Sequence, residues 1–338
     1  MNNWYLESGN HSDIVFSSRV RFARNIKGFP FPNKMNDEQR YAVIQKVSDA
    51  VLKSSVGADY QFVDIAKLDE NELFSMVERH LISPQFASDP SGRALILKND
   101  ESVSIMINEE DHLRIQCIKS GLELEKAYNE ADKLEKIIGE SVGYAFDNKF
   151  GFLTECPTNL GTGMRASAMI HLPALESIGA LNRIFNSLSQ FGVAIRGTFG
   201  EGSKIKNSMY QISNQITLGI SEKDAIDNIN SIINGLIQKE KEARKNYNEK
   251  QLEDTVYRAL GTLKYARMLS SEEFSNLISK LRLGVSMNLI DIPITLINEL
   301  SLVCGKAAVS VNLEHADNPS VRDTKRAEKV RERLKDYM

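Results

Sequence analysis

The sequence predicts an α+β fold, in which an antiparallel sheet is flanked by helices and a small all-helical domain follows. Up to about residue 218, short segments of alternating apolar and polar residues are interleaved with helical segments. After Ser221 the pattern is helical only. A chain of 338 residues is long enough for one large and one small domain. We therefore expect a lead-in of residues 1–13, a large domain of residues 14–248 and a helical domain of residues 249–338.

The composition is that of a globular protein from a reducing compartment. The net charge of −3 provides no basic field for nucleic acid. Cys117, Cys156 and Cys304 are far apart, odd in number and without zinc-type spacing. The N-terminus lacks the basic start and apolar core of a signal peptide, and no run approaches the ~18–20 apolar residues of a membrane span. We expect a cytoplasmic protein that binds neither nucleic acid directly nor a membrane.

The first predicted strand begins near Ile14. Its alternation places Arg19 and Arg21 on one face and Val20 and Phe22 on the other. Two neighbouring arginines repel each other unless an anion bridges them, although a solvated strand edge is the plainer interpretation. Helices are then expected over residues 37–53 and 71–81, a hairpin over 94–98 and 102–107, and a strand over 113–118.

An acidic cluster follows the second strand of that hairpin. Glu109, Glu110, Asp111 and His112 stand together, and like charges crowd there. A solvated turn accounts for one or two of them. Four together favour a cation, a positively charged substrate or general-base chemistry.

A turn-rich loop of residues 154–163 lies in the middle of the chain. Pro157, Gly161 and Gly163 allow tight turns and close approach to a ligand. Residues 164–172 are apolar enough for a helix that Pro173 would end. A loop before a helix can cradle an anion, and Arg165 can fork onto a phosphate. An ordinary surface loop with a buried cysteine is an equally good interpretation of the pattern.

The remaining elements complete the sheet and the second domain. We expect a helix over residues 123–138, short strands over 144–146 and 150–153, a helix over 177–191, and strands over 193–196 and 210–218, with a glycine-rich loop at 197–203. The C-terminal helices are expected over 221–248, 254–268, 271–281, 292–303 and 321–337. The last of these is charged nearly all round, as is typical of a surface helix.

One apolar stretch of the helical domain predicts a dimer surface, so that the protein would be a homodimer through this domain. The residues are Leu289, Ile290, Ile292, Ile294, Leu296 and Ile297.

Five arginines stand at strand or loop ends, and together they would form a polyphosphate clamp. They are Arg19, Arg21, Arg114, Arg165 and Arg196. The G-x-x-x-x-G-K-[ST] motif is absent, so the site is not of the Walker type. Glu110 and Glu201 would offer carboxylates to a cationic acceptor.

Four motifs resemble those of the ATP:guanidino phosphotransferase (phosphagen kinase) family. They are Ser17–Arg21, Asn108–Arg114, Cys156–Gly163 with Arg165–Ser167, and Arg196–Glu201. The motifs are long and in the family's order, and the match covers roughly residues 14–245. Only sixteen residues precede Ser17, whereas creatine and arginine kinases carry a helical domain before this motif. We therefore expect that this substrate-selecting domain is missing.

The tail carries the sequence Arg322, Asp323, Thr324, Lys325, Arg326, Ala327. It is similar to the Arg-Asp-x-x-Arg-Ala motif of bacterial McsB-type protein arginine kinases, where the motif binds phosphoarginine and regulates activity. This resemblance implies a kinase that uses ATP and Mg²⁺ to phosphorylate arginines of proteins in stress-response quality control. It further implies an McsA-type activator, a CtsR-type repressor as target, and delivery of marked proteins to a ClpC–ClpP protease.

The resemblance also implies roles for individual residues. Glu110 is the expected general base and Glu201 orients the guanidinium. Glu109 and Asp111 shape the site or its magnesium waters, and Cys156 tunes the site. No residue is assigned as a direct metal ligand. The residues expected to bind the nucleotide and its phosphates are Ser17, Ser18, Arg19, Val20, Arg21, His80, Arg114, Arg165, Ala166, Ser167, Ala168, Met169, Arg196, Gly197, Thr198, Phe199 and Gly200.

Two alternatives remain open at this stage. A kinase of free arginine or another small guanidino compound would use the same site, although the missing N-terminal domain argues against it. A phosphoarginine-binding adaptor with a decayed kinase site would belong to another class of protein. The intact set of Glu110, Glu201 and the arginines argues against that alternative.

Overall fold

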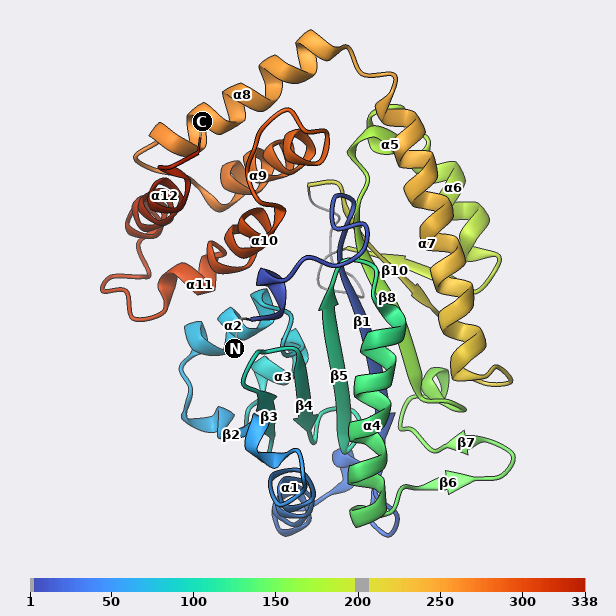
Figure 1. The fold of residues 1–338 in the computed structure, drawn as a ribbon. Helices are drawn as coiled ribbons and strands as arrows, with labels where there is room; N and C mark the ends of the chain where they lie inside the picture. The colour runs from blue at the N-terminus through green and yellow to red at the C-terminus, as the bar shows by residue number, and fades with distance from the viewer. Residues whose placement is uncertain (1–2, 198–206, 338) are drawn as a thin grey trace.

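A computed structural model describes residues 3–197 and 207–337. Its centre is an eight-stranded sheet with the strand order β2-β3-β4-β5-β1-β8-β10-β9, in which neighbouring strands are antiparallel (Figure 1). The fold class predicted from the sequence is confirmed. The strands are β1 (Val15–Arg24), β2 (Tyr60–Val63), β3 (Ala94–Lys98), β4 (Val103–Ile107), β5 (Leu113–Ser120), β8 (Met164–His171), β9 (Val193–Arg196) and β10 (Met209–Asn214). A separate small hairpin pairs β6 (Phe146–Asp147) with β7 (Gly151–Phe152).

Two long helices cover one face of the sheet. Helix α4 (Leu124–Val142) packs on β1 and β5, and helix α7 (Glu222–Arg244) packs on β8 and β10 (Figure 1). Alternate strand residues such as Val20, Ile115 and Ala166 are buried beneath these helices in the largest core cluster. The opposite residues of the same strands point to the other face, which is therefore free to carry polar groups.

Three further helices surround the first half of the sheet. Helix α1 (Asp37–Leu52) and helix α2 (Glu70–Glu78) both begin with capping boxes, in which Asn36 and Asp69 accept hydrogen bonds from the backbone three residues later. Helix α3 (Pro84–Ser88) begins with Ser83 as its N-cap. A second core cluster joins α2 and α3 to β3 and β4.

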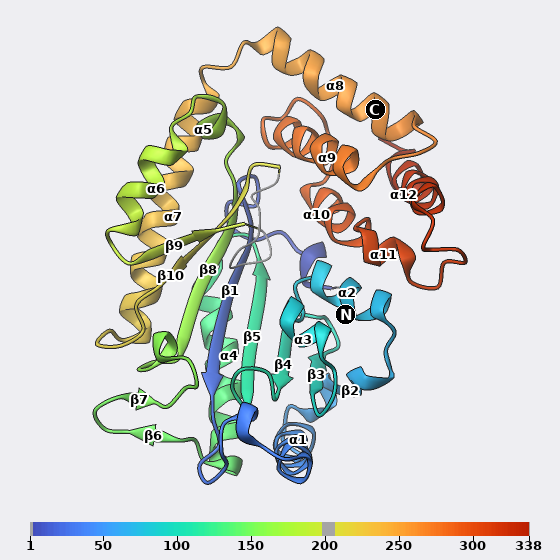
Figure 2. The same ribbon diagram turned by 180° about the vertical axis from the view of Figure 1, so that it is seen from behind.

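The C-terminal helices lie beside α2 and the N-terminal segment in both views of the molecule (Figures 1 and 2). They are α8 (Glu249–Tyr265), α9 (Ser271–Ser286), α10 (Ile294–Val303), α11 (Lys306–Ser310) and α12 (Pro319–Leu334). These helices enclose a hydrophobic cluster of their own. Across the described residues, no helix combines the length and apolar character needed to span a membrane.

Residues 164–172 do not form the helix that we expected. They form strand β8 at the centre of the sheet, between β1 and β10. Met164, Ala166, Ala168 and Ile170 are buried on the helix-covered face, while Arg165 and Ser167 alternate with them. Alanine and methionine favour a helix locally, so pairing with two neighbouring strands decided the outcome.

The predicted helix over residues 177–191 is shorter in the structure, which has a helix over residues 181–189, while Ser177 ends a separate preceding helix. Helix α5 (Pro173–Ser177) and helix α6 (Leu181–Ser189) are separated by Gly179, whose φ of +67° lies in the left-handed region. Ile178 is 56% exposed at this break.

The N-terminal lead-in is packed rather than loose. Trp4 and Tyr5 lie in a short 3₁₀ turn and are 2% and 6% exposed. They form a cluster with Phe16 of β1, Met169 of β8 and Leu302 of α10. The lead-in therefore joins the far face of the sheet to the C-terminal helices.

The prediction that residues 289–297 of the helical domain form a dimer surface is wrong. Ile290, Ile292, Leu296 and Ile297 are buried, and Leu289 and Ile294 pack against the same cluster. An apolar stripe in a small helical domain is needed first for the domain's own core.

Buried polar contacts join the two parts of the molecule. Arg282 of α9 donates to the carbonyl oxygen of Ser12 and, at 2.6 Å, to Oδ1 of Asn298. Glu78, near the end of α2, accepts hydrogen bonds from the backbone N–H groups of Ala307 and Ala308 in α11. The C-terminal helices are thus tied both to the strand-bearing part and to α2.

Candidate active site

Strand pairing places polar side chains from several strands on the face of the sheet that α4 and α7 do not cover. Arg21 of β1 lies opposite Arg165 of β8 and Gln116 of β5, and Arg19 lies opposite Ser167. Because these residues alternate with core residues, their side chains share the face not covered by α4 and α7. The strand pairing therefore assembles arginines from distant parts of the sequence.

A cleft of about 740 Å³ opens over this face. All five arginines of the predicted clamp line it: Arg19, Arg21, Arg114, Arg165 and Arg196. Four other predicted site residues line it too, namely His80, Glu109, Glu110 and Cys156. These side chains are brought together as the clamp hypothesis requires.

The arginines in the cleft repel one another. Burial, followed by the charges of Arg114 and Arg165, lowers the pKa of Arg19 to about 10. Burial and its arginine neighbours hold the pKa of Arg21 well below its ordinary value. The Nε atom of Arg21 is also buried, and it has no hydrogen-bond partner among the residues that the structure describes. A bound polyanion would relieve both the repulsion and the missing hydrogen bond.

Glu110 faces this positive field. Its carboxylate lies 3.2 Å from Arg114, and its side chain is 38% exposed. Burial raises its pKa, opposed by Arg114 and reinforced by Asp111 and Glu109. A carboxylate that is partly desolvated and still open to the cleft suits a general base.

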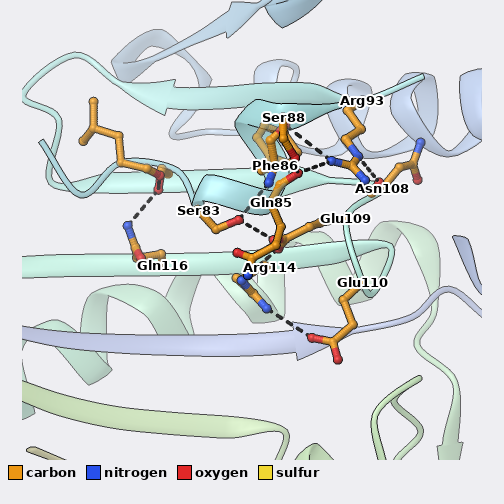
Figure 3. A network of polar contacts seen from close by, with 12 residues as sticks. Ser83, Gln85, Phe86, Ser88, Arg93, Asn108, Glu109, Glu110, Arg114 and Gln116 are labelled. Atoms are coloured by element: carbon orange, nitrogen blue, oxygen red, sulfur yellow. Dashed lines mark hydrogen bonds and ion pairs between the residues drawn. The ribbon is translucent and has the colours of Figure 1, made fainter. Parts of the chain in front are cut away.

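A network of polar contacts positions the acidic cluster (Figure 3). Glu109 forms an ion pair with Arg114 at 2.8 Å and accepts a hydrogen bond from the hydroxyl of Ser83. Arg93 donates to the carbonyl oxygens of Gln85 and Asn108, at 2.7 and 3.1 Å. The start of α3 thereby fixes the chain at the point where Glu109 and Glu110 enter the cleft.

Sequence reasoning missed Ser83 and Arg93. Both line the cleft together with Gln85. The Ser83-Pro84 pair is a helix-start signal that could have revealed α3 and its N-cap. No local pattern points to Arg93, because its partners are backbone carbonyls of segments that meet only in the fold.

Asp111 and His112 act as anchors of the loops around the cleft. The Asp111 carboxylate accepts hydrogen bonds from Nδ2 of Asn25 at 2.6 Å and from the backbone N–H of Glu155 at 2.8 Å. Nδ1 of His112 accepts from the backbone N–H of Ile26 at 2.9 Å. Asp111 thus connects the end of β1 to the loop that carries Cys156, whose sulfur lies 3.0 Å from Oγ1 of Thr158.

His80 lies at the inner end of the cleft, just after α2. Burial and the charge of Arg19 lower its pKa to about 3, so its ring is neutral at physiological pH. Its backbone carbonyl accepts a hydrogen bond from Nε2 of Gln116 at 2.7 Å. His80 therefore offers an uncharged surface beside the arginines.

Some predicted nucleotide-binding residues do not point into the cleft. The side chains of Ser18, Val20, Ala166 and Ala168 are buried on the helix-covered face, as strand alternation requires. For these four residues, the prediction that they bind the nucleotide now concerns their backbone atoms alone. Ser17, Ser167 and Met169 lie beside Arg19 and His80, and Gly197 is buried at the end of β9. Thr198, Phe199, Gly200 and Glu201 lie outside the described residues.

The tail motif lies on α12, and its members have different surroundings. Arg326 is fully buried and donates to the carbonyl oxygens of Leu269 and Cys304 and to Asp323. Arg322 is only half-buried and donates to the carbonyl oxygens of Ala316 and Asp317. Ala327 is buried, while Thr324 and Lys325 are at or near the surface.

Two family models match the chain. The C-terminal catalytic domain of ATP:guanido phosphotransferases matches residues 42–243, and the protein-arginine kinase McsB C-terminal domain matches residues 249–338. The protein-arginine kinase of Clostridium acetobutylicum is 44% identical over 99% of this chain and 100% of its own length. That of Caldanaerobacter subterraneus subsp. tengcongensis is 43% identical over 95% of this chain and 97% of its own.

Solved structures share the fold. Lombricine kinase superposes with a TM-score of 0.62 at 24% identity, over 72% of this chain and 70% of that one. The duplicated taurocyamine kinase of Schistosoma mansoni with bound transition-state analogue components gives 0.61 at 25% identity, over 75% of this chain and 39% of that one. Together with the arginine-lined cleft, these matches show that the chain is an ATP-dependent phosphotransferase and belongs to the protein-arginine kinase branch of the ATP:guanido phosphotransferase family.

Proposed function

We propose that this protein transfers the γ-phosphoryl group of ATP to the guanidinium of arginine side chains in proteins. The observation that carries the proposal is the position of Glu110, a carboxylate open to a cleft that five arginines line. The arginines match the polyphosphate of the donor, and the carboxylate matches the cationic acceptor. The names of the relatives, protein-arginine kinases over nearly their full length, support proteins as the substrate class.

The chemical difficulty is the acceptor. A guanidinium is about one part in 10⁶ neutral at pH 7, which corresponds to roughly 8 kcal/mol. Glu110 takes a proton from a guanidinium nitrogen, which attacks the γ-phosphorus. The new N–P bond forms as the bond from phosphorus to the β,γ-bridging oxygen breaks, and ADP leaves with that electron pair. Arg21, Arg114 and their neighbours stabilise the charge on the transferring group.

Glu109 has a positioning role in this proposal. It is paired with Arg114 and hydrogen-bonded to Ser83, so it holds Arg114 in line with the phosphates. We extend to Glu201 the role of orienting the guanidinium and to Cys156 that of tuning the site. These two roles stay predictions.

Mg²⁺ fits the donor set in a limited way. The described residues contain no group of three or more His, Cys, Asp or Glu side chains placed to hold a metal ion. The Glu109 carboxylate lies 2.8 Å from Arg114, so it would hold a magnesium-bound water, and ATP oxygens would supply the other ligands. When bound, the ion would neutralise phosphate charge.

The cellular setting belongs to the same proposal. We infer a cytoplasmic enzyme that marks proteins for a ClpC–ClpP protease, acts on a CtsR-type repressor, and responds to an McsA-type activator. Arg322 and Asp323 would take part in binding phosphoarginine as a regulatory ligand. Support comes from the match of residues 249–338 to the McsB C-terminal domain.

The experiment is incubation with Mg-ATP and an unstructured arginine-rich protein, with free arginine as the parallel acceptor. Acid-labile phosphate on protein arginines, located by mass spectrometry, is the expected result. Phosphate on free arginine alone would replace the proposal with a small-molecule guanidino kinase. Phosphate on neither, with phosphoarginine still bound in a titration, would replace it with a binding adaptor.

A further inference from the structure

Five large apolar side chains are exposed in neighbouring loops near the start of β8. They come from the small hairpin of β6 and β7, the turn before β9 and the segment after β10, and each is 43% to 66% exposed. The hairpin lies beside the starts of β8 and α7 in both views (Figures 1 and 2). Exposed apolar side chains that gather in one place mark an interaction site. We call this set the apolar rim: Phe146, Phe150, Phe191, Ile216 and Leu218.

Backbone contacts hold the segments of the apolar rim together. Gly151 of β7 forms a β-bridge with Gly161, and a Cβ added at Gly161 would lie 2.2 Å from the carbonyl oxygen of Thr217. The backbone N–H of Gln215 donates to the carbonyl oxygen of Gly192 at 2.8 Å. Gly151, Thr217 and Gly192 each adjoin a member of the rim in sequence. The exposed side chains therefore come from one compact group of loops.

The apolar rim is connected to the catalytic end of the cleft through one short loop. Thr217 lies between two members of the rim, and its hydroxyl donates to the carbonyl oxygen of Thr158 at 3.0 Å. Thr158 and Cys156 both line the cleft, and their side chains are 3.0 Å apart. Cys156 in turn forms a hydrogen bond with Glu110. The rim and Glu110 thus flank the same loop.

An acceptor arginine brings its own chain to this loop. Its long side chain reaches Glu110 in the cleft, while its backbone remains at the mouth. An extended chain advances about 3.3–3.6 Å per residue, so residues a few positions to one side of the arginine can lie over the apolar rim. Apolar side chains at those positions would be removed from water by this contact. The charges agree with this arrangement, because the carboxylate of Glu110 matches the guanidinium and the uncharged rim matches its apolar neighbours.

We propose that the apolar rim binds an extended segment of the substrate protein whose apolar residues stand a few positions from the acceptor arginine. The rim is then a specificity-determining surface that favours arginines in apolar sequence surroundings. Such segments are accessible in extended chains and are mostly buried in folded proteins. The proposal rests on the transfer to protein arginines proposed above, and it deepens that proposal by stating which arginines are preferred.

The test uses two peptides of equal length, each with one central arginine. Leucine and phenylalanine flank the arginine in the first peptide, and serine and glycine replace them in the second. We expect wild-type protein to show a KM about tenfold lower for the first peptide, as partial burial of one large apolar side chain predicts. In the double variant Ile216→Ser with Leu218→Ser, the KM for the first peptide should rise to that for the second, with kcat changed less than twofold.

Phe62→Ser is the matched control. Phe62 is 43% exposed, as Phe150 is, but it lies on β2, at the opposite end of the sheet from β9 and β10. This variant removes an exposed apolar side chain of similar size, and it should keep the wild-type preference for the first peptide.

Equal KM values for the two peptides in wild-type protein, or a preference that survives in the double variant, would overturn the proposal. A changed oligomeric state of the double variant in sedimentation, with its peptide preference intact, would make the apolar rim a contact between copies of the chain and would also overturn it. Fluorescence anisotropy of the labelled peptides without ATP repeats the comparison for binding alone. Preferential binding without phosphate transfer would contradict the proposed function and leave the docking surface in place.

Discussion

At the scale of single residues, Glu110 is the group on which the proposed chemistry depends. Glu110→Gln keeps the size of the side chain and removes the base, so we expect the rate of arginine phosphorylation to fall by about 10²–10⁴. Because burial raises the pKa of Glu110, activity should also fall as the pH drops through that raised pKa. Steady-state rates between pH 5 and 8, with nucleotide binding measured separately, check both expectations.

Glu155→Gln is the control for this prediction. Glu155 is a neighbouring carboxylate that contacts Asn33 and does not line the cleft. Its variant should keep the wild-type rate. A Glu110→Gln protein with wild-type turnover would remove Glu110 from the mechanism.

The two arginines of the tail motif should respond differently to substitution. Arg326 is buried among two carbonyl oxygens and the carboxylate of Asp323, so Arg326→Met should cost about 3–5 kcal/mol of unfolding free energy. Arg322→Ala should cost less than about 1 kcal/mol and weaken phosphoarginine binding. Chemical unfolding and phosphoarginine titration of both variants separate the roles. Equal stability loss in both would contradict this division.

Residue-level prediction from sequence was strongest where strand alternation decides the outcome. The two-residue period correctly put Arg19 and Arg21 on one face. The same period also puts the side chains of Ser18 and Val20 in the core. The resemblance of the whole motif Ser17–Arg21 did not distinguish these two residues from the arginines beside them. Ser83 and Arg93 were missed because their contacts join segments far apart in sequence.

At the scale of elements, the loop before β8 depends on close backbone approach at Gly163. Its φ is +59°, and an added Cβ would lie 2.8 Å from the carbonyl oxygen of Ala23. Gly163→Ala should therefore push this loop away from β1 and displace Arg165. We expect kcat/KM to fall by about tenfold or more, since small misplacements of binding groups are costly.

Gly143→Ala is the matched control, because Gly143 also has a positive φ, +68°, and no atom of residues 3–197 or 207–337 lies within 4 Å of its added Cβ. It carries the same backbone strain, about 1–2 kcal/mol, without the collision. Its kcat/KM should stay near the wild-type value. If the two variants lose activity equally, strain and not contact is responsible.

Element type was predictable except where tertiary pairing overrode local preference. The sequence of β8 is rich in alanine and methionine, which suit helices, yet the strand lies between two others. The prediction of one helix over residues 177–191 failed at Gly179, whose left-handed backbone conformation separates α5 from α6. Part of the core of the helical domain was predicted as a dimer surface. An apolar pattern does not show whether a residue packs inside its own domain or against a second molecule.

At the scale of the whole molecule, buried histidines make stability depend on pH. His80 and His171 are both buried, and burial lowers the pKa of each below the ordinary value of 6.5. Below about pH 6.5 the unfolded chain binds protons that the folded chain does not, so stability falls as the pH drops. Each histidine contributes about 1.4 kcal/mol per pH unit in this window. Unfolding free energies at pH 7.5, 6.5 and 5.5 measure the slope.

His171→Gln should reduce this slope by the share of one histidine, whereas the exposed His315→Asn should leave it unchanged. His171 also contacts Ser279 of α9 at 2.8 Å. Loss of stability in acid is therefore expected to begin where the sheet meets the C-terminal helices. A slope unaffected by His171→Gln would assign the acid sensitivity to other groups.

The packed lead-in gives this protein a built-in optical reporter. Trp4 is the only tryptophan of the chain, and it lies edge-on to Phe16 with 6.0 Å between ring centroids. Its cluster includes Met169 of β8 and Leu302 of α10. Its fluorescence should therefore lie at short wavelength while the helices are docked and shift to the red when they separate. Emission from one indole would follow the association of the two halves in real time, without any attached label.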